Sequence, residues 1–402
     1  MASIDLEKAF DMVIHTAVFT GLRDIGVHGS DINAIRSLYK EQKAYIQLDP
    51  NTRSRYFNVL RGVRQGDPLS PALFTNTVRE AMADLRKDRE NKGYGTIVGS
   101  DLRNKDRMAY AMFADDTTLI AKSKRALAKM LTDIKNKLGS IGLHLNGSKC
   151  FIQCSGKQIE PGTQVELNGE KYPICSCSDG FKILGTIVTL DGGVSTEFEA
   201  RLRAGWAIFS NLSAILRKKD SSEKKRLQLF QATVAKTVLW CAGSWKLSVA
   251  QKRKLRSTQR AMLRRMVGPN RRPEEDYITW VRRATSKAEE KARTAGTPCW
   301  VERQLKEKWR WAGKTANMER ERWARRTTEW RNNDWWNSQA KRTLSCPVRS
   351  RAGRFHRWED ELVSFAQHNH WEEDWFHKAN DIQFWASKED EFIKFAGIRK
   401  KS

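Results

Sequence analysis

The stretch YAMFADDTTLIAKS places Asp115 and Asp116 side by side between two apolar runs. Short apolar runs joined by polar turn residues predict a β-hairpin, here with strands over 108–114 and 117–121. Turn chemistry accounts for one aspartate, but two carboxylates about 4 Å apart repel by about 4 kcal/mol at an effective dielectric of about 20. A divalent metal ion would offset that repulsion. The alternative is a solvated acidic turn that needs no metal.

Two further motifs precede this hairpin. IDLEKAFD (4–11) predicts a strand that ends on Asp5, followed by a helix with Asp11, which we interpret as a cap or turn acid. RGVRQGDPLSPALF (61–74) predicts a loop that opens a helix, with Ser70 as the N-cap and a proline at the first helical position. Loop amides beside a helix N-terminus suit a phosphate or a nucleotide unit.

The charge of the chain indicates what kind of partner it meets. The 402 residues carry a net charge of +26, which favours a polyanion such as nucleic acid over a merely soluble basic surface. The 40% hydrophobic content is enough for a folded core and more than one domain. No apolar run is long enough to cross a membrane, and no secretory pattern opens the sequence. Seven cysteines do not suggest a disulfide framework, so we expect an intracellular protein of the nucleus or cytoplasm that is not secreted.

The sequence divides into three regions. Residues 1–190 are predicted to mix helices and strands, residues 191–269 to form amphipathic helices, and residues 270–402 to be basic, Trp-rich and mostly helical. In the first region, helices are expected over 70–88 and over 125–142, with Gly142 as the C-cap. Further strands are expected over 44–49, 57–63 and 181–188.

The last region concentrates charge and tryptophan. Residues 251–355 contain 29 Lys and Arg against 11 Asp and Glu, a net charge of +18 that predicts sequence-independent binding of RNA and DNA. The spacing of Trp309, Trp323 and Trp330 keeps them near one helical face. We expect most of these tryptophans to form a core; the alternative is nucleobase stacking on exposed rings.

The motifs DLEKAFD, RGVRQGDPLSPALF, FADD, GLHLNGSKC and ILG occur in this order at regular separations. The set resembles motifs A to E of reverse transcriptases, specifically those of non-LTR (LINE-type) retrotransposons. This resemblance covers residues 2–190 and implies an RNA-directed DNA polymerase. It implies an α+β fold class, with a palm of antiparallel sheet and packed helices, followed by a helical thumb-like region. The implied partners are an RNA template, a DNA primer and deoxynucleoside triphosphates; the oligomeric state stays open.

The resemblance assigns the catalytic and metal-binding roles residue by residue. Asp5 matches the motif A carboxylate, and Asp115 with Asp116 matches the motif C pair. Together they would hold two Mg²⁺ or Mn²⁺ ions about 3.5–4 Å apart, which activate the primer hydroxyl and steady the pyrophosphate. Lys149 matches the motif D lysine that protonates the leaving pyrophosphate, although by itself it would be an ordinary surface lysine.

The resemblance also implies a nucleotide-binding set and a primer grip. Phe10 matches the aromatic residue that blocks a ribose 2′-hydroxyl, although a plain core role would explain it equally well by itself. Gln65 and Gly66 match the motif B loop near the incoming nucleotide. Leu184 and Gly185 match the primer-grip hairpin.

Two features depart from the family pattern. The sequence opens at motif A, so the fingers region expected before it is absent, and we expect a truncated copy whose activity is doubtful. The alternative function is therefore a non-catalytic nucleic-acid-binding remnant of a retroelement. Four cysteines could hold zinc, but their spacing is atypical of such sites: Cys150, Cys154, Cys175 and Cys177.

Overall fold

The computed structural model describes residues 1–83, 85, 92–97, 107–155, 159–160, 162–176, 179–190, 192–329, 357–372 and 374–397. Within these residues the chain forms two compact units, the first ending at Gly185 and the second beginning at Thr186. Among the helices that could be examined, none is long and apolar enough to cross a membrane.

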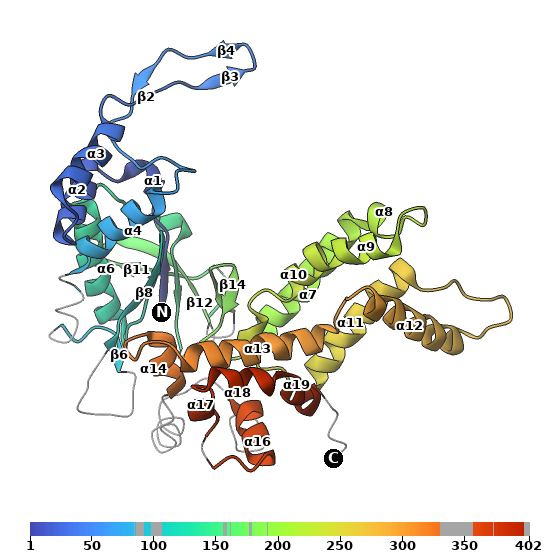
Figure 1. Cartoon of the computed structure of the whole chain (residues 1–402). Coiled ribbons are helices and arrows are strands. Elements are labelled where there is room, and N and C mark those ends of the chain that lie inside the picture. Colours follow the sequence, from blue (N-terminus) through green and yellow to red (C-terminus); the bar gives the residue numbers. More distant parts are fainter. Residues whose placement is uncertain are drawn as a thin grey trace. The chain divides into compact units, whose positions relative to one another are not determined.

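A six-stranded sheet forms the centre of the first unit, in the order β11-β12-β10-β1-β9-β8 (Figure 1). The middle strand β1 pairs antiparallel with β9 through Ala2 and Leu119 and antiparallel with β10 through Ala2 and Ile152, so it is supported on both sides. Only β10 and β12 run parallel. The strands are β1 (Ala2–Ile4), β8 (Tyr110–Phe113), β9 (Asp116–Leu119), β10 (Phe151–Gln153), β11 (Gln164–Leu167) and β12 (Glu170–Cys175).

Helices pack against this sheet and bury its apolar face. Their inward side chains, among them Phe74 and Met130, join Ile4 of β1 in one hydrophobic core. The unit is therefore α+β, which confirms the predicted fold class. The helices are α1 (Ala9–Met12), α2 (His15–Asp24), α3 (Gly29–Tyr39), α4 (Ser70–Ala81) and α6 (Lys124–Gly139), with a 3-10 turn η1 (Gly147–Lys149).

The two predicted helices of this unit exist, but their ends differ from the prediction. Helix α4 begins at Ser70, and Leu69 occupies the cap position; the Leu69 amide donates to Asp67 Oδ1 at 2.8 Å. The prediction of Ser70 as N-cap was therefore wrong, because Asp67 accepts an amide hydrogen at this end of the helix. Helix α6 ends at Gly139, and Gly142 adopts a left-handed φ of 84° beyond the end.

The segment between α3 and α4 forms an extended arm (Figure 1). Its short strands are β2 (Lys43–Ala44), β3 (Gln47–Asp49), β4 (Thr52–Arg53) and β5 (Phe57–Asn58). The predicted strand over 57–63 stops at Asn58, because Gly62 takes a φ of 90° that no regular strand allows. The remaining strands of the unit are β6 (Thr96–Ile97), β7 (Arg107–Met108) and β13 (Phe181–Ile183).

In its described residues the second unit has helices and one strand, β14 (Thr186–Val188). The amphipathic helices predicted over residues 191–269 correspond to α7, to the α9-η2-α10 run and to α11. Ser248 caps α11 in a capping box with Gln251. The helices up to this point are α7 (Ser195–Asn211), α8 (Ser213–Leu216), α9 (Glu223–Phe230), the π-helix η2 (Gln231–Ala235), α10 (Lys236–Val238), η3 (Ala242–Ser244) and α11 (Val249–Val267).

One hydrophobic cluster runs through this unit from Phe198 to Phe392 and includes residues on both sides of position 269. The helices beyond that position are α12 (Tyr277–Thr294), α13 (Trp300–Ala316), α14 (Trp323–Glu329), α16 (Asp360–His368), α17 (Trp375–Lys378), α18 (Ile382–Ser387) and α19 (Glu389–Gly397).

Tryptophans supply much of this core, as expected. Trp309 and Trp385 stack with ring centroids 3.6 Å apart, and each indole Nε1–H donates to the other residue's carbonyl oxygen at 3.0 Å. Trp300 and Trp375 are also buried, whereas Trp323 is half-buried and Trp330 lies outside the described residues. The core interpretation is therefore confirmed for the buried tryptophans.

A buried ion network lies beside these rings. The side chain of Lys308 has no exposed surface, and its Nζ lies 2.5 Å from Glu361 Oε2. Lys252 contacts the other carboxylate oxygen of Glu361 and donates to the carbonyl oxygen of Ala396 at 3.0 Å. Three helices, α11, α13 and α16, thus meet at one carboxylate.

Candidate active site

The first catalytic candidate, Asp5, follows the middle strand of the sheet. Its carbonyl oxygen accepts the amide hydrogen of Asn146 at 2.8 Å, and two residues later the amide of Glu7 donates to His144 at 2.9 Å. These bonds fix the segment before η1 against the end of β1. As a result Lys149 Nζ lies 3.7 Å from Asp5 Oδ2.

The hairpin β8-β9 carries the other two acids. Phe113 pairs with Asp116, so the turn consists of Ala114, which has a left-handed φ of 51°, and Asp115. Strand β9 pairs with β1 through Thr117 and Ile4, and continuing this antiparallel register by one residue sets Asp116 opposite Asp5. The predicted hairpin is confirmed, and it brings the acidic turn to the end of the strand that leads into Asp5.

The three carboxylates act on one another electrostatically. Burial raises the pKa of Asp116 above its usual range, and the nearby charges of Asp115 and Asp5 raise it further. Across the described residues, however, no group of three or more His, Cys, Asp or Glu side chains is arranged closely enough to hold a metal ion. Carboxylate oxygens are the donors that Mg²⁺ and Mn²⁺ prefer, so the donor chemistry fits such ions although the side chains do not yet converge.

The raised pKa of Asp116 predicts a pH-dependent effect of Asp116→Asn. A carboxyl group whose folded-state pKa exceeds its unfolded value destabilises the fold at neutral pH, where it must be ionised. Without divalent metal, Asp116→Asn should therefore raise the melting temperature slightly at pH 7. The gain should shrink as the pH falls through the folded-state pKa and vanish below about pH 3.9, the unfolded value. Melting curves of both proteins from pH 3 to 8 would test this; a gain independent of pH would contradict it.

The motif B loop is bound to the motif A segment through its backbone. The amide of Gly62 donates to Val13 and the amide of Val63 donates to Phe10, both at 2.7 Å, and His15 Nε2 lies 2.9 Å from the carbonyl oxygen of Gly62. A Cβ on Gly62 would lie 2.8 Å from the Asp11 carbonyl oxygen, so this close approach requires glycine.

The nucleotide-binding candidates lie along this contact. Phe10 is half-buried and stacks on Phe74 with ring centroids 4.6 Å apart, which is a packing contact of the kind that a core role requires. Gln65 Nε2 donates to Asp11 Oδ1 at 3.0 Å, so Asp11 orients a loop glutamine. Gly66 has a φ of 88°, and no atom lies within 4 Å of the position that a Cβ would take there.

The primer-grip candidates lie in a turn after β13. Leu184 and Gly185 have positive φ values of 48° and 79°, and Leu184 is exposed. The structure does not bring them into the acidic cluster.

The cysteines do not form a metal site within the described chain. Cys150 is buried, Cys175 is half-buried and Cys154 is exposed, and all three are free thiols. Cys177 lies outside the described residues.

Sequence reasoning missed two residues that build this site. His15 contacts the Gly62 carbonyl oxygen, and Asn146 contacts the Asp5 carbonyl oxygen. Neither residue has a spacing signal, because each acts through a backbone atom of a residue far away in the sequence. The asparagine in the turn-like LNGS stretch indicated a bend there, but not which segment it would meet.

The sheet of the first unit thus sets an acidic hairpin beside a strand-ending aspartate, with a lysine near that aspartate. Residues 1–188 match the reverse transcriptase (RNA-dependent DNA polymerase) family. This part of the chain is similar to the reverse transcriptase domains of non-LTR retrotransposons.

Two relatives illustrate that branch. The Pol polyprotein of the type-1 retrotransposable element R2 of Nasonia vitripennis is 30% identical over 204 residues, which are 49% of this chain and 19% of the relative. The Pol polyprotein of the type-2 element R2DM of Drosophila melanogaster is 30% identical over 200 residues, 48% of this chain and 18% of the relative. The chain thus spans about a fifth of the length of these relatives.

The chain has a weak similarity to the solved structure of telomerase from Candida tropicalis in complex with a fragment of telomeric RNA. The alignment covers 76% of this chain and 46% of that one, at a TM-score of 0.33 and 13% identity.

Proposed function

We propose that the first unit is the palm of an RNA-directed DNA polymerase of a retrotransposon, which extends a DNA primer on an RNA template. The observation that carries the proposal is the placement of three carboxylates, from Asp5, Asp115 and Asp116, around the end of β1, where the pKa of Asp116 responds to the other two. If the hairpin were only a solvated acidic turn, it would not need the Asp5 carboxylate at the end of a second strand beside it.

In this proposal Asp5, Asp115 and Asp116 hold two Mg²⁺ or Mn²⁺ ions. When bound, such ions lower the pKa of a hydroxyl nucleophile and neutralise charge on a leaving pyrophosphate. Lys149, which lies 3.7 Å from Asp5, would give a proton to that leaving group. Gln65, oriented by Asp11, would contact the incoming deoxynucleoside triphosphate, and Phe10 would exclude a ribose 2′-hydroxyl.

A thermal melt with and without millimolar Mg²⁺ or Mn²⁺ tests the metal site. Bound metal stabilises the folded state by about 2.7 kcal/mol at a hundred times its dissociation constant. Wild-type protein should therefore melt at a higher temperature with metal. Asp115→Asn should lose this response but keep an apo fold at least as stable, because it removes a repulsion together with a ligand.

The matched control is Asp24→Asn, which neutralises an exposed aspartate at the end of α2. This variant should keep the full metal response. Equal metal responses in wild type and Asp115→Asn would contradict the metal site, whatever the control shows.

A second candidate function is nucleic-acid binding without synthesis. It is favoured by helix α11, which carries seven Lys and Arg and no Asp or Glu over Val249–Val267. Primer extension on an RNA template distinguishes the two functions: incorporation of deoxynucleotides that Asp115→Asn abolishes supports the polymerase, whereas binding without incorporation supports the remnant.

A further inference from the structure

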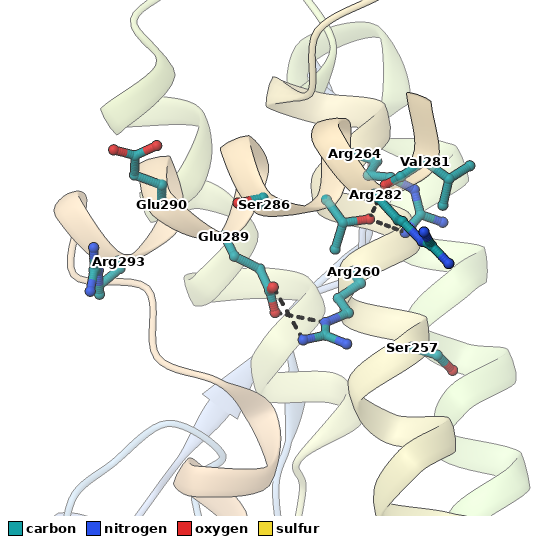
Figure 2. Close-up of a pocket in the computed structure, with 10 residues that line it drawn as sticks. Ser257, Arg260, Arg264, Val281, Arg282, Ser286, Glu289, Glu290 and Arg293 are labelled. Carbon is teal, nitrogen blue, oxygen red and sulfur yellow. Dashed lines mark hydrogen bonds and ion pairs between the residues drawn. The ribbon is translucent and has the colours of Figure 1, made fainter. Parts of the chain in front are cut away.

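A groove between α11 and α12, within the second unit, collects arginines from both helices (Figure 2). Its volume is about 790 Å³. Helix α11 contributes Arg260 and Arg264 to the lining, and α12 contributes Arg282 and Arg293. On each helix the lining residues recur every three or four positions and therefore share one face. On α11 they are Ser257, Arg260 and Arg264. On α12 they are Arg282, Ser286, Glu289 and Arg293.

The arginines of this groove differ in how their charge is compensated. Arg260 forms two hydrogen bonds with the Glu289 carboxylate, at 2.7 and 3.2 Å, so its charge is largely neutralised. Arg264 donates to the hydroxyl of Thr285 at 3.0 Å, and that hydroxyl donates in turn to the carbonyl oxygen of Val281 at 2.6 Å. Arg264 is therefore held in place by a neutral partner and keeps its full charge.

Some of the cations elsewhere on the two helices are paired with acids. Lys254 pairs with Glu199, Lys291 with Glu223 and Arg283 with Glu275, at 2.6 to 2.7 Å. Within the described part of the chain, the structure records no such pair for Arg264, Arg282 or Arg293. Within the same described residues, Arg253, Arg256 and Arg265 of α11 also have no recorded acid. The groove differs because the half-buried guanidinium of Arg264 is positioned there by a hydroxyl group and not by a carboxylate.

We propose that this groove binds the phosphate backbone of a nucleic-acid strand, with Arg264 and Arg282 as phosphate contacts at one end and Arg293 at the other. The inference rests on the proposed function, since it supplies the site that holds the template–primer. Fixed guanidinium groups match phosphate oxygens, and a neutral hydroxyl partner orients Arg264 without competing for its charge.

The length of the basic stripe favours a polynucleotide over a single nucleotide. Arg282 and Arg293 are eleven positions apart, which corresponds to about 16 Å along the helix axis. A strand of a duplex advances about 3.4 Å per nucleotide, so this distance corresponds to about five nucleotides. A mononucleotide would contact one end of the groove and leave the other arginines without a phosphate.

The pairing of Arg260 with Glu289 makes a second, opposite prediction possible. The carboxylate of Glu289 lies in the groove and would repel a phosphate while it occupies Arg260. Removing that carboxylate should therefore improve binding, because it frees one more guanidinium. A purely structural role of the pair would not produce tighter binding.

The test measures binding of the full chain to a fluorescent RNA–DNA hybrid by anisotropy, in chelator, between about 50 and 200 mM salt. In Arg264→Gln/Arg282→Gln the fall of log affinity with log salt should become less steep by about 2 in the slope. Binding should weaken about 50-fold at about 0.1 M salt, because the counterions of two phosphates are no longer released. In Glu289→Gln the salt dependence should become steeper by about 1 in the slope, and binding should tighten several-fold.

The control is Arg203→Gln/Arg217→Gln, which removes two exposed arginines outside the groove and should shift the slope much less. Any of three results would overturn the proposal: equal losses of affinity in the two double variants, an unchanged slope in Arg264→Gln/Arg282→Gln, or weaker binding by Glu289→Gln. Displacement of the hybrid by millimolar deoxynucleoside triphosphate would reassign the groove to a mononucleotide. Because the assay contains no metal, Asp115→Asn should bind as wild type does, so failure of the polymerase proposal would appear separately.

Discussion

Glu361→Gln is expected to lower the free energy of unfolding by about 3–5 kcal/mol, because it leaves a buried lysine without its counter-charge. The carboxylate of Glu361 contacts both Lys308 and Lys252. Burial lowers the pKa of Lys308, which shows how unfavourable an unpaired ammonium group would be there. Glutamine keeps the shape of the side chain and removes only the charge, so the loss of stability would be electrostatic. Urea denaturation of both proteins measures the difference.

The control for this prediction is Glu391→Gln on α19. Glu391 also pairs with a lysine, Lys388, at 2.9 Å, but its side chain is about half exposed, so its replacement should change stability by less than about 1 kcal/mol. Similar effects of the two substitutions would contradict the assignment of Glu361 as a buried counter-charge.

The effect of Glu361→Gln should also depend on pH. Burial raises the pKa of Glu361, but Lys308 and Lys252 outweigh burial and bring it below its usual range. A depressed carboxyl pKa contributes stability that is present above the unfolded value, about 4.3, and is lost as the pH falls through the folded value. The difference between wild type and Glu361→Gln should therefore decrease in that acidic range.

Gly62→Ala is expected to destabilise the first unit by several kcal/mol and to displace the motif B loop. Two effects add: a φ of 90° strains any residue with a Cβ by about 1–2 kcal/mol, and the new Cβ would lie 2.8 Å from the carbonyl oxygen and 2.9 Å from the Cα of Asp11. Those neighbours are backbone atoms, so the loop itself must move. The melting temperature of the variant measures the total loss of stability.

Gly66→Ala is a closely matched comparison in the same loop. Gly66 has nearly the same φ, 88°, but nothing lies within 4 Å of the position of its Cβ. It should therefore show the conformational strain of about 1–2 kcal/mol alone. If the two substitutions destabilise the protein equally, the close packing of the loop on Asp11 contributes nothing.

The local parts of this fold could be predicted from the sequence. The hairpin around Asp115 and Asp116 follows from two apolar runs and a polar turn, and the cap of α11 follows from Ser248 and Gln251, because each signal lies within a few residues. The short distance between Lys149 and Asp5 could not be predicted from the residues, because 144 positions separate them and no periodicity connects them.

Contacts made through the backbone, or between distant helices, could not be predicted in this way. The Asp11–Gln65 hydrogen bond depends on the conformation of the Gly62 loop. The arginines of α11 looked alike in the sequence, and only the structure distinguishes Arg260, which pairs with Glu289, from Arg264, which donates to Thr285. A charge count gives the sign of the surface potential but not which charges are already neutralised.

The position of β1 has a consequence for how the domain forms during synthesis. Its two partners, β9 and β10, begin more than 100 residues later in the sequence, so the strand that leads into Asp5 has nothing to pair with until they have been translated. At about 5–20 residues per second, the chain between β1 and β10 takes about 7–30 s to synthesise. The segments that carry Asp5, Asp115 and Asp116 are then positioned by long-range strand pairing, the slowest kind of contact to form. A ribosome-stalled chain that ends before β10 should therefore lack the protection of β1 amides from hydrogen exchange that the finished domain shows.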